Sequence, residues 1–367
     1  MTDWIAPPVE TLAPGLVRVA TPRGPFTLAE TDAQVIEAAS RNARAGFFNP
    51  QADPAALCDK SLQHALVRKV EPDLAFEAVD QARAEDVPSA PERTLVVRPR
   101  LSASSKGSAL VIGPDRPPSP AERAYLARCG ALHAHVHEPG QPIFVNGVVS
   151  GGRLALADVW RCILMPIGCR DILASVVNLP RAALPADLTE RLGRLARALG
   201  ILAGPVHFEL VLTQAGGARL VKAAPRLATE PLPALCRLGG QPGQRALFER
   251  ARAHGFETAL PDTPEPEGFV ADYSFVVDEE GVLLDLPDLP EIRRLPTYRY
   301  LYQEPALGAR AAPTFDGYSY GATVFLAHAA LEVLEADIAR LDAINRRGAF
   351  VVGPVADDLV PLAEAAR

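Results

Sequence analysis

Several features that mark common protein classes are absent from this sequence of 367 residues. It contains no run of eighteen apolar residues, and its N-terminus (MTDWIAPPVE) lacks the charged and apolar segments of a secretory signal. We therefore expect a cytoplasmic protein with no membrane partner. The net charge is −7 and no basic stripe is interleaved with aromatic residues, so we also expect no nucleic-acid partner.

Cysteine is scarce and scattered. The five cysteines include no C-x-x-C pair, and their odd number argues against a disulfide framework or a zinc ribbon. We interpret them as small buried or unreactive thiols. The sequence also lacks a Ser-His-Asp order, a Walker loop, a Rossmann fingerprint and an H-E-x-x-H motif, which removes the simplest assignments of enzyme class.

The length predicts two or three domains. Residues 1–55 are interrupted by proline and glycine and contain one helical stretch, near residues 32–45, which is too little for a full nucleotide-type domain. Apolar spacing predicts a helix over residues 54–70. After a proline-rich segment, residues 266–367 are expected to form a small α+β domain with a long helix over residues 323–345.

Strand patterns dominate the middle of the chain. β-branched runs on either side of a polar loop predict strand, loop, strand, and two pairs of apolar segments joined by glycine-containing turns predict hairpins. One clear helix follows Asp187, with Glu190 completing a capping box, and ends at Gly200. The predicted elements are strands 94–97 and 109–112, helix 120–129 with Ser119 as its N-cap, hairpin 142–149/153–160, helix 188–199, and hairpin 207–213/218–223.

The loop after the first of these strands (RPRLSASSKG, residues 98–107) has a composition that suits a polyphosphate. Small residues let backbone N–H groups approach phosphate oxygens without obstruction by a Cβ atom, and a basic side chain at the strand end balances the charge. A solvated, serine-rich hairpin loop explains the same residues.

A second motif lies in the last predicted hairpin, where Glu209 and Lys222 occupy two paired strands. There the chain resembles the ATP-grasp superfamily. In that family a strand carrying a glutamate is followed by a return strand ending Glu-x-Asn-x-Arg, whose carboxylates and amide hold magnesium on ATP. Residues 222–226 (KAAPR) stand at that position here.

Four further segments resemble the family in the same order. The loop at 98–107 resembles its Lys-Pro-x-x-Gly-Ser-x-Ser-x-Gly phosphate loop, and Asp59-Lys60 resembles its Asp-Lys pair at the head of the preceding helix. Residues 138–147 resemble the strand that follows the adenine-contacting hinge. Residues 316–321 resemble the closing domain of carboxylate–amine ligases and biotin carboxylases. The resemblance covers residues 55 to 352.

The resemblance implies an α+β protein with the ATP-grasp fold, in which two α+β subdomains clasp a nucleotide cleft. The expected organisation is a shortened N-terminal region (1–55), a core (56–265) made of two lobes, and a C-terminal α+β domain (266–367). The lobes are expected at 56–140 and 141–265.

The resemblance also implies a set of site residues and a cofactor, ATP. It places Glu209 on a metal, Arg226 on an acyl or phosphate intermediate, and His135 and His137 beside the nucleotide. A plain salt bridge explains Arg226 equally well. The residues implied in phosphate binding are Lys60, Arg98, Ser102, Ser104, Ser105, Lys106 and Gly107.

Two departures from the family pattern concern magnesium. Lys222 stands where the second metal carboxylate is expected, and Ala224 stands where the amide is expected. Magnesium prefers oxygen ligands, and a charge change of two units within about 4 Å is worth several kcal/mol at an effective dielectric near 20. The usual two-magnesium arrangement therefore cannot form unless ligands come from elsewhere. Lys222 is instead expected to act as a built-in cation that pairs with Glu209 or contacts a phosphate.

Four histidines suggest other chemistry. His133, His135 and His137 alternate, so on a strand they share one face, a spacing that suits a transition metal. Ring stacking beside the adenine site, or simple exposure, is the competing interpretation. His207 shares a face with Glu209; packing is its default role, and a general base is the alternative.

Three functional hypotheses follow. The first is an ATP-dependent carboxylate–amine ligase, which forms an amide through an acyl phosphate from small-molecule carboxylate and amine substrates, in small-molecule or peptide biosynthesis. The second is a degenerate ATP-grasp protein that acts as a non-catalytic binding or regulatory subunit. The third is a cleft recruited for metal-free chemistry with Lys222 as acid, base or phosphate clamp. A homodimer, or a heteromer with another pathway enzyme, is compatible with each.

Overall fold

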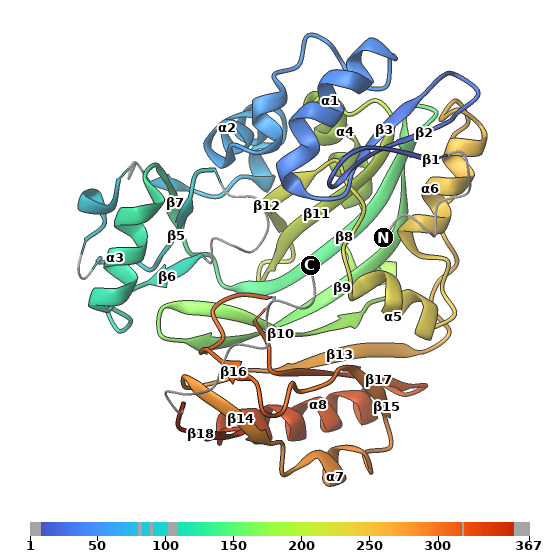
Figure 1. Cartoon of the computed structure of the whole chain (residues 1–367). Helices are drawn as coiled ribbons and strands as arrows, with labels where there is room; N and C mark the ends of the chain where they lie inside the picture. The colour runs from blue at the N-terminus through green and yellow to red at the C-terminus, as the bar shows by residue number, and fades with distance from the viewer. Residues whose placement is uncertain (1–8, 80–82, 89–90, 102–108, 318, 356–367) are drawn as a thin grey trace.

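The computed structural model describes residues 9–79, 83–88, 91–101, 109–317 and 319–355. They form a mixed α+β structure built around one large, mostly antiparallel sheet (Figure 1). None of the helices in these ranges is long and apolar enough to cross a membrane.

The middle of the sheet consists of five long strands in the spatial order β12-β11-β8-β9-β10. Both hairpins predicted from the sequence are present. Gly151 and Gly152 turn between β8 and β9, and Gly216 turns between β11 and β12, all with positive φ. The strands are β8 (Gly140–Ser150), β9 (Arg153–Ile167), β10 (Arg170–Asn178), β11 (Gly204–Thr213) and β12 (Ala218–Ala224).

Helices cover both faces of these strands. Alternate residues of β8 and β11, including Val145 and Phe208, pack in a core with Leu192 and Leu195 of α4. The opposite face carries Val148, which packs in a second core with α6. These helices are α2 (Lys60–Val70), α4 (Leu188–Ala198), α5 (Leu232–Leu238) and α6 (Gly243–Ala253). The polar residues Asn146, His207 and Glu209 alternate with the first core, so they point to the face that α6 covers.

Two predicted helix starts differ in the structure. Asp187 precedes α4, but its side chain makes no capping hydrogen bond; its carboxylate lies 3.7 Å from a guanidinium nitrogen of Arg191 instead. The predicted helix 54–70 is divided at Cys58 into a 3-10 turn and α2, because Asp59 accepts hydrogen bonds from the backbone of the first turn and begins a new helix. The short 3-10 helices are η1 (Asp32–Gln34), η2 (Pro54–Leu57), η3 (Pro72–Leu74), η4 (Ala84–Asp86) and η6 (Arg181–Ala183).

The predicted strand–loop–strand and the helix after it lie at one end of the large sheet. Ser119 caps the helix as expected: its hydroxyl accepts the backbone N–H of Glu122, whose carboxylate accepts the backbone N–H of Ser119 at 2.9 Å. The sheet continues through this part by a single residue pair, Arg170 with Leu110. The elements are β4 (Ala78–Val79), β5 (Leu95–Pro99), β6 (Leu110–Ile112), α3 (Pro120–Cys129) and β7 (Leu132–Val136).

The N-terminal segment contains more structure than its sequence predicts. A three-stranded antiparallel sheet precedes the expected helix, comprising β1 (Val9–Ala13), β2 (Leu16–Val19), β3 (Phe26–Ala29) and α1 (Val35–Arg44). The strands were not predicted because β3 is buried on both faces and shows no alternation. Phe26 of β3 and Phe47 pack with Phe248 and Phe256, with ring centroids 5.0–5.8 Å apart, which attaches this segment to α6.

A glycine at the start of β11 permits this aromatic packing. Gly204 has φ +102°, and a Cβ atom there would lie 2.4 Å from the ring of Phe26. We expect Gly204→Ala to lower the free energy of unfolding by roughly 3 kcal/mol, because backbone strain adds to overpacking. Gly216→Ala is the matched control: φ is +83° but the space around it is open, so only about 1–2 kcal/mol is expected. Urea denaturation of both variants measures the difference; equal losses would contradict the packing argument.

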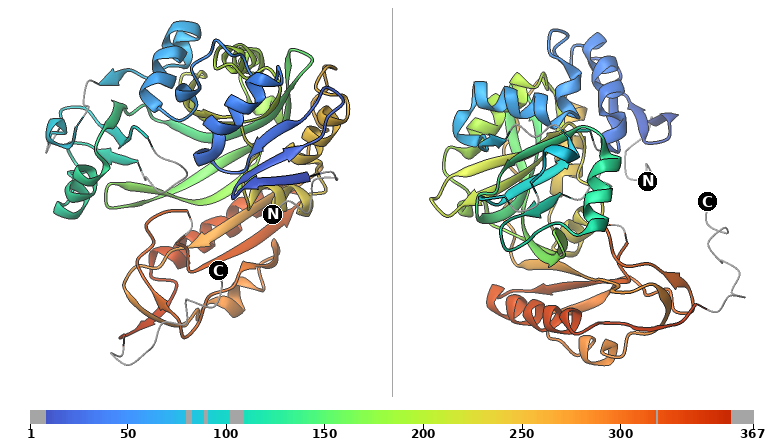
Figure 2. Two further views of the ribbon diagram at one scale, coloured as in Figure 1. Left: turned by 45° about the horizontal axis from the view of Figure 1, so that its top comes forward. Right: turned by 90° about the vertical axis from the view of Figure 1, so that its left-hand side faces the viewer.

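The C-terminal part corrects one prediction. Residues 323–328 belong to a buried strand, β17, and the helix begins only at Leu331, whereas the sequence pattern had predicted one helix over 323–345. A short apolar run buried on both faces has no period that separates strand from helix. The elements are β13 (Phe269–Phe275), β14 (Gly281–Asp285), α7 (Leu289–Ile292), β15 (Tyr298–Gln303), β16 (Arg310–Ala311), β17 (Ala322–His328), α8 (Leu331–Arg346) and β18 (Val351–Gly353). In both views of Figure 2 these orange and red elements gather on one side of the molecule, away from the blue N-terminal helices.

Candidate functional site

A cavity of about 260 Å³ lies where the β5–β7 strands face the long central strands. One part of its wall is apolar and includes Val111, Ile143 and Leu173. Charged and polar side chains line the rest: Arg98, His135, His137, Glu138, Asp171 and Glu209. The cavity therefore offers both an apolar surface and a charged end to one ligand.

Arg98 is the most buried cation of the cavity. It lies at the end of β5, and one terminal guanidinium nitrogen is 2.7 Å from Nε2 of His135. Because guanidinium only donates, His135 accepts at Nε2 and carries its proton on Nδ1, which donates to the Val136 carbonyl at 2.9 Å. Among the described residues the Nε atom of Arg98 has no hydrogen-bond partner. A buried donor without an acceptor suits an anionic ligand.

The pKa values around Arg98 show how strongly this region is desolvated. Burial lowers the pKa of Arg98 to about 10, and burial together with the charge of Arg98 lowers the pKa of His135 to about 2. His135 is thus neutral, and its ring stacks on Phe76 with centroids 4.0 Å apart. Lys60, at the start of α2, has its pKa lowered to about 8 by burial and by the charges of Arg98 and Lys222. Positive charge therefore concentrates at this end of the cavity.

Glu209 lies on β11 opposite Lys222 of β12 and beside Phe144 of β8. Burial raises the pKa of Glu209, but the contact with His207 and the charge of Lys222 outweigh it and bring the pKa to about 2. Nε2 of His207 is 3.7 Å from the carboxylate of Glu209. Glu209 is therefore ionised and lies among positive groups.

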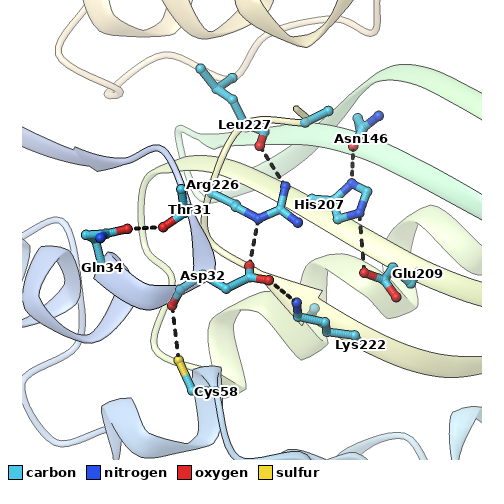
Figure 3. A network of polar contacts seen from close by, with 12 residues as sticks. Thr31, Asp32, Gln34, Cys58, Asn146, His207, Glu209, Lys222, Arg226 and Leu227 are labelled. Carbon is cyan, nitrogen blue, oxygen red and sulfur yellow. Dashed lines mark hydrogen bonds and ion pairs between the residues drawn. The ribbon is translucent and has the colours of Figure 1, made fainter. Parts of the chain in front are cut away.

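Lys222 pairs with a residue that sequence reasoning did not single out. Figure 3 shows the carboxylate of Asp32, from η1, between Lys222 and Arg226. Nε of Arg226 is 2.7 Å from one oxygen of Asp32, and the Lys222 ammonium bonds the other. Asp32, Lys222 and Arg226 have side chains only 3%, 13% and 9% exposed. Burial raises the pKa of Asp32, but the two cations lower it far below its usual range.

A chain of polar contacts leads from Glu209 into the sheet. Nδ1 of His207 is 2.7 Å from Oδ1 of Asn146, and Nδ2 of Asn146 donates to Asp158 at 2.5 Å. Since Asn146 donates through its nitrogen, its oxygen accepts from His207, and Nδ1 of His207 carries a proton. Figure 3 shows His207 between Asn146 and Glu209. Asn146 and Asp158 thereby fix the imidazole orientation beside Glu209.

The structure places the predicted site residues in three groups. Arg98, His135, His137 and Glu209 line the cavity, whereas Lys222 and Arg226 are held on Asp32. The phosphate-loop residues Ser102, Ser104, Ser105, Lys106 and Gly107 lie outside the described residues. His133 is 3.3 Å from the hydroxyl of Ser61 and packs against His64. Within the described ranges, no group of three or more histidine, cysteine, aspartate or glutamate side chains is arranged to hold a metal ion.

The described residues around Glu209 do not fit the two-magnesium arrangement that the sequence resemblance implies. Three carboxylates line the cavity, but Glu138 pairs with Arg219 and Asp171 pairs with Arg116. Glu209 occupies the first ligand position of the pattern, while Lys222 stands at the second and Ala224 at the amide position. Asp32 brings a further carboxylate close to Lys222, but its oxygens bond Lys222 and Arg226.

Comparisons with known proteins were made for sequence and for structure. No protein-family model matches the chain, and no curated protein matches it in sequence. An L-amino acid ligase from Bacillus licheniformis is similar in structure, with a TM-score of 0.65, 14% identity, and 89% of this chain and 79% of that chain covered. A carboxyaminoimidazole ribonucleotide synthase from Aspergillus clavatus, solved with ATP, has a TM-score of 0.58, 14% identity and coverage of 87% and 81%.

A phosphoribosylglycinamide synthetase from Anaerococcus prevotii is a third match, with a TM-score of 0.53, 9% identity and coverage of 88% and 81%. Each of the three matches covers 87–89% of this chain. The large antiparallel sheet, the helices on its faces and the predicted hairpins agree with the fold of these proteins. The chain has the ATP-grasp fold of carboxylate–amine ligases.

Proposed function

We propose that the chain binds ATP in the cavity between β5–β7 and the central strands and acts as a carboxylate–amine ligase. The observation that carries the proposal is the buried Arg98, whose Nε has no protein partner among the described residues and which lies in the same cavity wall as apolar side chains. An adenine ring suits the apolar wall, and phosphates suit the cationic end. The shared fold with a synthase solved with ATP supports this assignment.

The proposed reaction forms an amide from a carboxylate and an amine. ATP supplies a phosphoryl group that converts the carboxylate into an acyl phosphate; the amine then forms the C–N bond as the C–O bond to phosphate breaks. In this scheme Lys60, Arg98 and the predicted Lys106 hold phosphate oxygens, and Arg226 orients the acyl phosphate. Electrostatic stabilisation of the transferred group by fixed cations is the main source of rate enhancement in such chemistry.

Asp32 has a positioning role in this proposal. By pairing with both Lys222 and Arg226 it holds two cations at fixed positions near Glu209. Lys222 then supplies, as a side chain, positive charge at the place where the family pattern has a metal ligand. The substrates remain a small-molecule carboxylate and a small-molecule amine, and the proposed location is the cytoplasm.

A second function is favoured by the same ion pairs. The Lys222 ammonium and the Arg226 guanidinium are both engaged by Asp32. Of the three carboxylates in the described cavity wall, Glu138 pairs with Arg219 and Asp171 with Arg116, which leaves Glu209. A protein that binds a nucleotide without turning it over, as a binding or regulatory subunit, needs no second metal ligand. Metal-free chemistry with Lys222 as a phosphate clamp is a third use of the same arrangement.

Calorimetric titration with a non-hydrolysable ATP analogue, with and without magnesium, separates these functions. We expect the analogue to bind, and magnesium to strengthen binding by roughly tenfold, about 1.4 kcal/mol, because Glu209 is ionised and faces the cavity. ADP release in the presence of carboxylates and amines then tests the ligase. Binding that is indifferent to magnesium, without ADP release, would favour the non-catalytic function. Absence of binding would eliminate every nucleotide-dependent proposal.

A further inference from the structure

A second cavity of about 260 Å³ lies between α5, α6 and strand β9, on the same face of the sheet as Glu209. Its wall is largely apolar and includes Leu232, Pro233, Cys236 and Ala246. The volume lies just below the range of roughly 300–1,000 Å³ found for drug-sized ligands, so a ligand of amino-acid size fits it.

The cations Arg237 and Arg245 also line this wall and pair with Glu230. Three other polar groups leave a charge or a hydrogen-bonding atom without a partner among the described residues. The Asp158 carboxylate is buried and accepts hydrogen bonds from Trp160 Nε1 at 2.6 Å, from Asn146 and from the backbone N–H of Gln244. All three donors are neutral, and Asp158 forms no ion pair with any described residue. Burial raises the pKa of Asp158, which reflects the missing cation.

The other two groups have unused hydrogen-bonding atoms. Oε2 of Glu249 bonds Arg252, whereas its Oε1 is buried and has no partner among the described residues. The amide nitrogen of Gln241 is likewise buried and without an acceptor there. Buried polar atoms in native proteins are rarely left unpaired, so these atoms mark positions that a ligand can satisfy. The ligand must donate to Glu249 and accept from Gln241.

We propose that this cavity binds an apolar α-amino acid. Its ammonium group supplies the positive charge that Asp158 lacks and the donor that Oε1 of Glu249 lacks. Its carboxylate accepts from Gln241, and its side chain packs on Leu232 and Cys236.

The cavity is connected to the first site through the sheet. Asp158, Asn146, His207 and Glu209 form one chain of polar contacts from one cavity wall to the other. Asp158 and Glu209 lie two strands apart, at about 4.8 Å per strand, and two residues apart along the strand direction, at about 3.4 Å per residue. Their backbones are therefore about 12 Å apart. At this distance the amino acid is out of reach of a group that reacts beside Glu209, so the proposal is a binding site next to the first cavity and does not rest on the proposed function.

Calorimetric titration of the full chain with L-leucine, in the absence of nucleotide, tests the site. We expect L-leucine to bind, and 4-methylpentanoate and isopentylamine each to bind at least tenfold more weakly, because each lacks one required group. Equal affinity for L-leucine and 4-methylpentanoate, or no binding of L-leucine, would overturn the proposal.

Two variants locate the binding. Ala246→Trp, which fills the cavity from α6, should abolish L-leucine binding, and Gln241→Ala should weaken it about tenfold through loss of one charge-assisted hydrogen bond. Gln214→Ala, at the exposed β11–β12 turn, is the matched control and should change nothing. Unchanged affinity in Ala246→Trp would place the ligand elsewhere and overturn the assignment.

A parallel titration with the ATP analogue keeps the two proposals separate. Nucleotide binding without L-leucine binding would remove the amino-acid site and leave the proposed nucleotide site intact. L-leucine binding without nucleotide binding would support the cavity while removing the ligase function.

Discussion

Asp32→Asn should lower the free energy of unfolding by about 3–5 kcal/mol, because removing one partner leaves buried charges uncompensated. Asp32 is 3% exposed and is bonded by Lys222 and Arg226, which are themselves 13% and 9% exposed. The amide of asparagine keeps the shape but loses the charge that offsets two cations. Urea denaturation at neutral pH measures the loss.

Two further variants make this result specific. Asp187→Asn removes a carboxylate that is 65% exposed and 3.7 Å from Arg191, and should cost less than about 1 kcal/mol. Asp32→Asn combined with Lys222→Met removes one of the stranded cations and should recover part of the loss. If Asp32→Asn costs no more than Asp187→Asn, the ion pairs contribute nothing to stability and the proposed positioning role of Asp32 fails.

The same pairs predict how stability depends on pH. The pKa of Asp32 is lowered in the folded state, so its contribution is present above the ordinary aspartate pKa of about 3.9 and is lost as pH falls toward the folded value. The wild-type protein should therefore lose stability below about pH 4 more steeply than Asp32→Asn does.

Arg98→Met should weaken binding of the ATP analogue by roughly 10- to 100-fold, since hydrogen bonds to charged groups contribute about 1.5–3 kcal/mol. Methionine matches much of the volume of the side chain and removes a buried cation whose pKa is already lowered to about 10. Replacing a buried charge by an apolar group of similar size is often neutral for stability, so the loss should appear in affinity and not in unfolding. Calorimetry and urea denaturation of the same sample separate the two effects.

Arg98→Lys is the informative companion. It keeps the charge but loses the planar fork that reaches both His135 and a ligand, so it should retain part of the affinity. Arg93 pairs with Glu77 at the surface and provides the matched control. Arg93→Met should have no effect on nucleotide binding. If Arg98→Met and Arg93→Met bind the analogue equally well, Arg98 does not contact the phosphates.

Much of the central fold was predictable because its signals are local. Glycine turns mark both hairpins, and the capping box at Ser119 marks α3. The order of short motifs then indicated the ATP-grasp fold, which the structural matches confirm. Prediction failed where both faces of an element are buried: β3 and β17 have no polar alternation, so β3 was missed and β17 was assigned to a helix.

The site was predictable only in part. The motif positions led to Glu209, Arg98 and the cavity that they share, although the roles assigned to them stay predictions. Asp32 carried no signal, because it lies 190 residues before its partner Lys222 and belongs to a segment that looked too short to matter. Local sequence patterns do not indicate a contact between residues so far apart along the chain. The grouping of Asp158, Gln241 and Glu249 in the second cavity was not predicted for the same reason.

The single residue pair between β6 and β10 has a mechanical consequence. Among the described residues, Leu110 and Arg170 are the one ladder pair that joins the β4–β7 strands to the central sheet. Close by, the backbone N–H of Val111 donates to the Cys169 carbonyl, and Arg116 bonds the carbonyls of Gly168 and Arg170 and pairs with Asp171. A joint this narrow resists sliding but permits tilting. We therefore expect the β4–β7 unit to rotate as one rigid body about this joint. This rotation would widen and narrow the first cavity. Affinity for any ligand held there would include the free energy of closing the hinge.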